Sequence, residues 1–283
     1  MAYPTVDAPY GLKPINLIGG QVFAGSTRMY PIQYNYATDI FYGDFVVLSR
    51  GYITRAAVST GTGSNQVTGI FLGCSFTSPT TKQKIFSQFW SGVPSSAAGD
   101  AVAYICDDPD TVFKGVVCSA TTVLASGARA LVGANLSMIN NATGVRRTGN
   151  SSNAILAPTA TPVTTILPVR CVGVVEDTAT SISATGSSST TTITLTGSGL
   201  PSAITVGTDV AYLDSEGQLI QTGSFVTAAA SAGATSVTIN SAIAVPGSIT
   251  AIPSASTIVF TTYPEILVKL NLLVHGYYSS TTA

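Results

Sequence analysis

Short apolar runs separated by turn residues recur along the whole chain. Residues 101–106 form a continuous apolar run, and residues 107–110 read Asp-Asp-Pro-Asp. Residues 111–118 form a second, mostly apolar segment that includes Thr111 and Lys114. Runs of about 4 to 8 apolar residues between turn signals are typical of strands buried on both faces. Pro109 cannot donate to a sheet, and aspartates readily close turns. We therefore expect a buried β-hairpin here, with an acidic tip, at the centre of the fold.

Similar turns introduce other apolar runs. A glycine and an aspartate precede valine-rich segments at Gly43-Asp44, Gly99-Asp100 and Gly207-Thr208-Asp209. Their irregular spacing argues against a solenoid repeat. No window holds a 3.6-residue apolar stripe over three turns, and only 126–132 favours a short helix. The pattern predicts an all-β fold with a β-barrel or sandwich core, whose strands we expect at 30–36, 44–48, 52–56, 69–76, 130–140 and 167–176.

The composition changes twice along the chain. Residues 177–262 consist mainly of Ser, Thr, Ala, Gly and Val. The more varied composition of the first part of the chain resumes at Pro264. We interpret 177–262 as a small inserted β module, because exposed loops accept insertions whose ends lie close together. The core β domain is then 29–176 plus 263–283. Within the module we expect a low-complexity edge at 181–190 and five strands at 191–196, 209–213, 219–226, 236–239 and 257–260.

Residues 1–28 form an extended N-terminal arm in this interpretation. Three prolines prevent a helix, and the tyrosines have few local partners to bury them. An arm that docks on a neighbouring molecule explains this pattern, and an edge strand packed on its own barrel explains it equally well. The candidate contact residues are Tyr3, Pro4, Tyr10, Leu12 and Pro14.

Charge is scarce in this chain. Only 9% of the residues are charged and the net charge is -1, whereas about a quarter of the residues of an ordinary soluble domain are charged. A surface with so little self-repulsion favours a homo-oligomer. The absence of a basic cluster argues against nucleic-acid binding, and no apolar run is long enough to suggest a membrane partner. The start lacks the pattern of a secretory signal, so we expect synthesis in a cytoplasm.

Catalytic and metal-binding patterns are weak. His275 is the only histidine and has no triad-like neighbours, so we expect a structural role and no enzyme activity. Asp107, Asp108 and Asp110 concentrate oxygen ligands, but calcium-loop spacing is missing and a solvated turn is the simpler interpretation. We therefore expect no metal and no cofactor. The four cysteines fit buried free thiols better than disulfides, although the hairpin would bring Cys106 near Cys118.

Four segments together resemble a known family. They are Pro9-Tyr10-Gly11-Leu12-Lys13-Pro14-Ile15, Gly43-Asp44-Phe45-Val46, the segment from Tyr104 to Phe113, and Glu265-Ile266-Leu267-Val268-Lys269-Leu270-Asn271. They resemble capsid decoration, or cement, proteins of tailed bacteriophages, over residues 8–176 and 264–275. The module at 177–262 departs from that family's pattern and resembles small β modules of phage structural proteins.

The resemblance implies a structural virion protein made in the host bacterial cytoplasm. Such a protein decorates the outer capsid surface and stabilises the head by bridging capsomers. Its partners would be the major capsid protein and further copies of itself, as a trimer rather than a dimer. The alternative is a tail or adhesin-like component that binds a host surface glycan.

Overall fold

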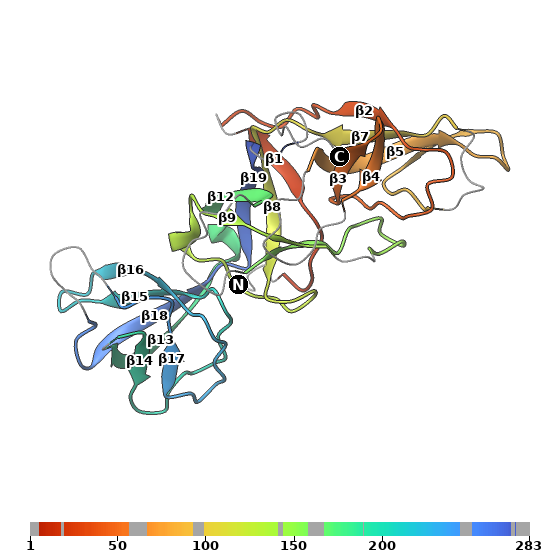
Figure 1. The fold of residues 1–283 in the computed structure, drawn as a ribbon. Coiled ribbons are helices and arrows are strands. Elements are labelled where there is room, and N and C mark those ends of the chain that lie inside the picture. Colours follow the sequence, from red (N-terminus) through yellow and green to blue (C-terminus); the bar gives the residue numbers. More distant parts are fainter. Residues whose placement is uncertain are drawn as a thin grey trace.

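The computed structural model describes residues 6–17, 20–56, 67–92, 99–140, 144–157, 167–188, 190–243, 251–272 and 275. Within these ranges the regular structure is β strand, apart from two single-turn 3-10 helices, η2 (Arg129–Leu131) and η3 (Glu176–Thr178). The prediction of an all-β fold is confirmed. The strands form three sheets, which appear in Figure 1 as three lobes with the lobe of β8 and β19 between the other two.

The central sheet is organised around β8 (Thr111–Cys118). This strand pairs antiparallel with β19 and β1 and parallel with β11. The sheet follows the order β10-β11-β8-β19-β12-β9, and it is nearly closed, because only Ser137 separates its two end strands β9 and β10 in the chain. Its other strands are β1 (Lys13–Leu17), β9 (Asn135–Leu136), β10 (Met138–Ile139), β11 (Ala154–Leu156), β12 (Val169–Val174) and β19 (Glu265–Leu270).

A second sheet forms its own barrel-like lobe. Its order is β2-β7-β5-β3-β4, with β6 added on β5, and a bridge between Ile32 and Ile53 links its two ends. Phe71 and Trp90 are buried in a separate apolar cluster inside it. The strands are β2 (Arg28–Pro31), β3 (Phe45–Ser49), β4 (Tyr52–Arg55), β5 (Gly69–Thr77), β6 (Lys84–Ser87) and β7 (Val102–Cys106).

The third sheet contains the strands between Thr180 and Thr262. Its order is β16-β15-β18-β13-β14-β17, and a bridge between Val226 and Ile239 joins its two ends. The flanking strands β12 and β19 pair with each other, so the chain leaves and re-enters the central sheet at neighbouring points. The strands are β13 (Thr180–Ser188), β14 (Thr192–Leu195), β15 (Asp209–Leu213), β16 (Leu219–Phe225), β17 (Ser236–Thr238) and β18 (Ser256–Thr262).

The predicted central hairpin is wrong. The strands β7 and β8 exist and are largely buried, but β7 pairs with β2 and β5, whereas β8 pairs with β1, β11 and β19. Residues 107–110 therefore carry the chain from the second sheet to the central one. The reason is that both strands offer apolar side chains on two faces, and each finds better partners in a different sheet. Cys106 and Cys118 consequently lie in different sheets.

The low-complexity segment at 181–190 is also not an edge. It forms most of β13, which lies between β18 and β14 inside the third sheet. Threonine favours strands, and hydroxyl pairs across strands stabilise them. Such pairs join Thr180 to Thr262 at 2.6 Å and Ser181 to Thr261 at 2.9 Å.

Two further segments differ from expectation. Residues 130–140, predicted as one strand, contain the end of η2 and the two short strands β9 and β10. The short helix expected within 126–132 corresponds to η2. In the part of the chain that the structure describes, no helix has the length and apolar character needed to cross a membrane.

Candidate functional site

The described part of the N-terminal segment lies on the protein's own central sheet. Leu12 is 1% exposed and belongs to the central apolar cluster, while Pro14 pairs with Phe113 through β1 and β8. This placement corresponds to the second alternative above, an edge strand on its own core. Tyr3 and Pro4 lie outside the described residues. Contact of the segment with a capsid or another subunit stays a prediction.

Two glycines allow this segment to approach the turn before β3. Gly11 and Gly43 have φ angles of 80° and 91°, in the left-handed region that favours glycine. A Cβ atom on Gly11 would lie 2.7 Å from the carbonyl oxygen of Gly43. The Leu12 N–H donates to that same oxygen at 3.1 Å, and the Gly11 N–H donates to the carbonyl oxygen of Asn153 at 2.9 Å.

Tyr10 attaches the segment to β19. Its hydroxyl donates to Oε1 of Glu265, a residue that is 3% exposed, and Lys114 Nζ lies 3.3 Å from the same oxygen. The Lys13 ammonium lies 4.3 Å from the centre of the Tyr10 ring. Burial, and then the bond to Glu265, raise the pKa of Tyr10 well above its usual range. The buried carboxylate is thus paired, as its burial requires.

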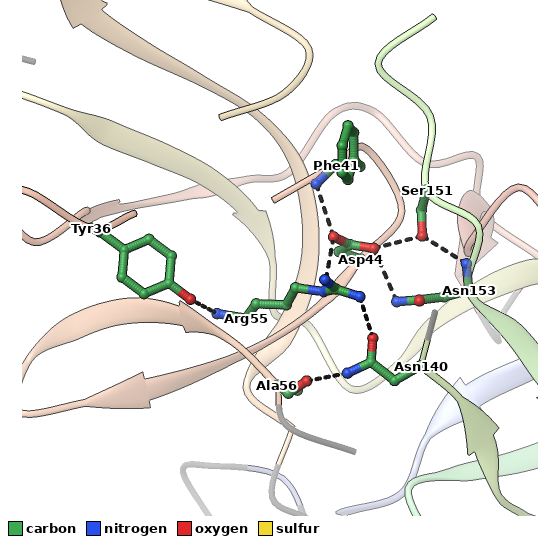
Figure 2. A network of polar contacts seen from close by, with 8 residues as sticks. All are labelled: Tyr36, Phe41, Asp44, Arg55, Ala56, Asn140, Ser151 and Asn153. Atoms are coloured by element: carbon green, nitrogen blue, oxygen red, sulfur yellow. Dashed lines mark hydrogen bonds and ion pairs between the residues drawn. The ribbon is translucent and has the colours of Figure 1, made fainter. Parts of the chain in front are cut away.

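Asp44 is the centre of a buried polar network, which Figure 2 shows. Its carboxylate accepts hydrogen bonds from the Phe41 N–H at 2.9 Å, Ser151 Oγ at 2.5 Å and Asn153 Nδ2 at 2.9 Å. Arg55 Nε lies 3.5 Å from Asp44 Oδ2, the oxygen that also accepts from the Phe41 N–H. Burial raises the pKa of Asp44, and the donors and Arg55 oppose that change.

Arg55 extends this network to a third segment (Figure 2). Its Nη2 donates to Asn140 Oδ1 at 2.5 Å, and Asn140 Nδ2 donates to the carbonyl oxygen of Ala56 at 2.6 Å. The Arg55 N–H donates to the hydroxyl of Tyr36 at 2.9 Å. The network therefore joins the second sheet to loops of the central one. Breaking one partner of such a buried charge pair typically costs about 3 to 5 kcal/mol.

Only one part of this network is recognisable from the sequence. The Gly43-Asp44 turn is recognisable locally, but Asp44 meets Ser151 and Asn153 across more than a hundred residues of chain. Residues 150–165, which include these two side chains, are rich in Ser, Thr and Ala, a composition that predicts a connector. The described part of this segment contains β11, and the side chains of Ser151 and Asn153 are buried. Only the folded topology brings the partners together.

The acidic turn at 107–110 is mainly a structural junction. Asp107 is 8% exposed, accepts a hydrogen bond from the Tyr30 hydroxyl at 3.0 Å, and lies 3.1 Å from Arg28 Nε. His275 is fully buried, and its Nε2 donates to the carbonyl oxygen of Asp107 at 2.9 Å. Burial lowers the pKa of His275, so the ring is neutral. The histidine thus lies beside a carbonyl and a strand, as a structural group does.

The surroundings of Asp108 and Asp110 give no indication of a ligand site. Asp108 Oδ1 accepts from the Asp110 N–H at 2.9 Å, which is an ordinary Asx turn. Among the described residues, no group of three or more His, Cys, Asp or Glu side chains is arranged to hold a metal. The four cysteines are free and buried, and burial raises the pKa of Cys106 to about 11 and that of Cys74 to about 12.

The junction between the module and the central sheet is closely fitted. Gly207 has a φ of 85°, and a Cβ atom there would lie 1.7 Å from the carbonyl oxygen of Ser126. The Ser126 N–H donates to the Val206 carbonyl at 3.0 Å, and the Tyr263 N–H donates to Ser126 Oγ at 2.6 Å. Phe225 of β16 joins the central apolar cluster. These contacts fix the module on the core. We call the residues that make them the seat of the module: Ser126, Val206, Gly207, Phe225 and Tyr263.

Charged groups surround this seat. Arg129 Nη2 lies 2.5 Å from Glu176 Oε1 and 3.1 Å from the Tyr263 hydroxyl. Asp209, the first residue of β15, is 3% exposed and accepts a hydrogen bond from the Val210 N–H at 3.1 Å. Burial raises the pKa of Asp209 to about 6, and the backbone N–H groups of Val210 and Arg129 lower it less.

Comparisons of this chain with protein-family models, with curated proteins and with solved structures give no match.

Proposed function

We propose that this chain is a structural virion protein that decorates the outer surface of a tailed-phage head and bridges subunits of the major capsid protein. The proposal assigns it no catalytic role and assumes a homo-oligomer. One observation carries it: the four segments that resemble decoration proteins, although distant in sequence, are linked by direct contacts in the fold. A chance likeness of short segments would have no reason to be contiguous in space.

The contacts between these segments are direct. Residues 9–15 contain the start of β1, which pairs with β8, and residues 265–271 contain β19, which pairs with the other side of β8. Residues 104–113 lead into β8 itself. The turn at residues 43–46 receives the hydrogen bond from the Leu12 N–H. The four segments, which come from the central and the second sheet, are therefore linked to one another in the fold, and this supports the proposal.

The buried polar groups around these segments support a structural role. The Asp44 carboxylate and the Arg55 guanidinium connect three segments, and Glu265 is paired with Tyr10 and Lys114. Each of these carboxylates is used in internal contacts. Networks of this kind rigidify a fold when all members are satisfied. Rigidity suits a protein that must resist forces on a capsid.

The exposed apolar residues of 22–34 supply a contact surface for the capsid in this proposal. Val22, Met29 and Tyr34 are 80%, 67% and 62% exposed. Exposed apolar surface can mark an interaction site, and these three side chains lie within one stretch of the chain. Because few charges are present, binding should depend only weakly on salt.

Particles of the phage that encodes the chain provide the test. Heads made without the chain should release DNA at a lower temperature than complete heads, and addition of the purified chain should restore their resistance. The double variant Met29→Ser/Tyr34→Ser should restore it poorly, while Val145→Ser, a change at another exposed apolar residue, should act as wild type. Absence of the chain from purified heads, or unchanged heat resistance without it, would contradict the proposal.

A further inference from the structure

The second sheet carries a hollow of about 540 Å³ on its outer face. Its lining includes Tyr42, Gly73, Phe86, Ser87, Gln88 and Tyr104. Sites for small ligands are typically concavities of this size, at places where structural units meet, with aromatic walls and a few polar groups. The hollow has these properties, and neither the network of Figure 2 nor the proposed capsid contact uses it.

Strand geometry explains the position of the hollow. Alternate residues of β7 share a face, so Tyr104 and Cys106 point to the same side of the sheet. Cys106 packs in the central apolar cluster, while Tyr104 lies farther along β7, where that contact ends. Gly73 pairs with Tyr104 and has no side chain to fill the space beside the ring. A bulge between Phe71 and Gly73 interrupts the register at this point.

Phe86 forms an exposed wall. It pairs with Ser75 across β5 and β6, and the Tyr104 hydroxyl donates to Ser75 Oγ at 3.1 Å, so the two rings flank one serine on the same face. Phe86 is 74% exposed. An aromatic ring left this open gains free energy when an apolar surface covers it.

The polar groups of the hollow are neutral and partly unused. None of its lining residues is charged. Gln88 Nε2 donates to Asn150 Oδ1 at 3.0 Å, while Gln88 Oε1 and the hydroxyl of Tyr42 have no hydrogen-bond partner among the described residues. Hydroxyl and amide groups of this kind can both donate to and accept from ligand hydroxyls.

We propose that this hollow binds a neutral carbohydrate, with the C–H face of one pyranose ring on Phe86 and the ring's hydroxyls bonded to Tyr42 and Gln88. A sugar ring presents an apolar face and a polar edge, which matches a wall of one aromatic ring beside neutral donors and acceptors. A charged ligand would lack a counter-charge here. An extended peptide would add to a free strand edge, whereas this hollow lies on the face of the sheet.

The hollow is open to solvent. The inference does not depend on the proposed capsid role, because a protein on an outer surface can bridge subunits and bind a glycan with different faces. It assigns to the second sheet a function that the resemblance does not include.

The test uses the purified full chain on an array of neutral oligosaccharides built from hexoses and N-acetylhexosamines, followed by calorimetric titration of the best binder. We expect saturable binding that Phe86→Ala weakens by about tenfold or more, as loss of a central aromatic anchor does. Gln88→Ala should also weaken it. Ile85→Ala, on the same strand but facing the other side and 37% exposed, should leave the affinity unchanged.

Because Phe86 is largely exposed, its truncation should leave the fold intact, and circular dichroism of the variant checks this. The proposal is overturned if no neutral oligosaccharide binds saturably, or if Phe86→Ala binds as tightly as wild type. Self-association of the chain that disappears in Phe86→Ala, without sugar binding, would also overturn it and would assign the face to contact between copies.

Discussion

Replacing Asp209 by asparagine should stabilise the protein at neutral pH. The carboxyl group is 3% exposed at the seat of the module, and burial raises its pKa from 3.8 to about 6. At pH 7 the folded protein therefore holds a carboxylate that water would solvate better in the unfolded chain. Asparagine keeps an oxygen that can accept the Val210 N–H and carries no charge.

The size and the sign follow from the two pKa values. A rise from 3.8 to about 6 corresponds to about 3 kcal/mol, at 1.36 kcal/mol per pKa unit. The folded state binds the proton of Asp209 more tightly than the unfolded state does. Binding of this proton therefore favours folding, and its contribution is complete at pH values below the unfolded pKa. It is lost as the pH rises through the folded pKa. Asp209→Asn should thus raise the free energy of unfolding by up to about 3 kcal/mol at pH 7 and by little near pH 4.

Urea unfolding followed by circular dichroism between about pH 4 and pH 8 measures the effect, as the difference between variant and wild type at each pH. Other buried carboxyls such as Asp44 and Asp107 titrate in both proteins and cancel in this difference. Asp177→Asn, an exposed change near the same junction, is the matched control. A difference that does not vary with pH, or a variant less stable than wild type at pH 7, would refute the reasoning.

Three further predictions concern stability. Gly11→Ala should lower the free energy of unfolding by about 2 kcal/mol or more in urea unfolding, because it adds a Cβ at a positive φ against Gly43, and unchanged stability would contradict the close approach. Tyr212→Phe should raise the melting temperature, because its buried hydroxyl has no partner among the described residues, whereas Tyr263→Phe, which loses a bond to Arg129, should lower it. Equal shifts of the two would refute this. Deletion of 178–261 with a short Gly/Ser linker should leave a cooperative unfolding transition, since β12 and β19 pair directly, and an insoluble or non-cooperative remainder would contradict it.

The strands were predictable because their signal is local. Apolar runs between glycine turns identified β3, β5, β15 and β16 to within about two residues. Their partners were not predictable. The segment 101–118 reads as a hairpin, because a turn between two apolar runs has the same sequence whether the runs pair or separate into two sheets. The choice depended on β1, β19 and β2, which lie far away in sequence.

The serine- and threonine-rich β13 was missed for a related reason. Its composition resembles a flexible linker, and only pairing with β18 shows that its small side chains let strands approach closely. Gly186 illustrates this, since a Cβ atom there would lie 2.5 Å from the carbonyl oxygen of Thr194. The contacts of the candidate site were the least predictable part of the structure. The partners of Asp44, Asp209 and Glu265 are set by topology, which a single sequence does not reveal.

The closure of the sheets explains how a chain with so little charge can avoid uncontrolled aggregation. Charge repulsion normally keeps proteins apart, and free strand edges are where they join end to end. Here the ends of the second sheet meet at Ile32 and Ile53, and those of the third meet at Val226 and Ile239. These bridges leave fewer backbone donors and acceptors at the ends of the two sheets open to another chain. Copies of such a protein can be close together at high local concentration. The contacts between them then depend on side chains rather than on unpaired backbone groups at strand edges.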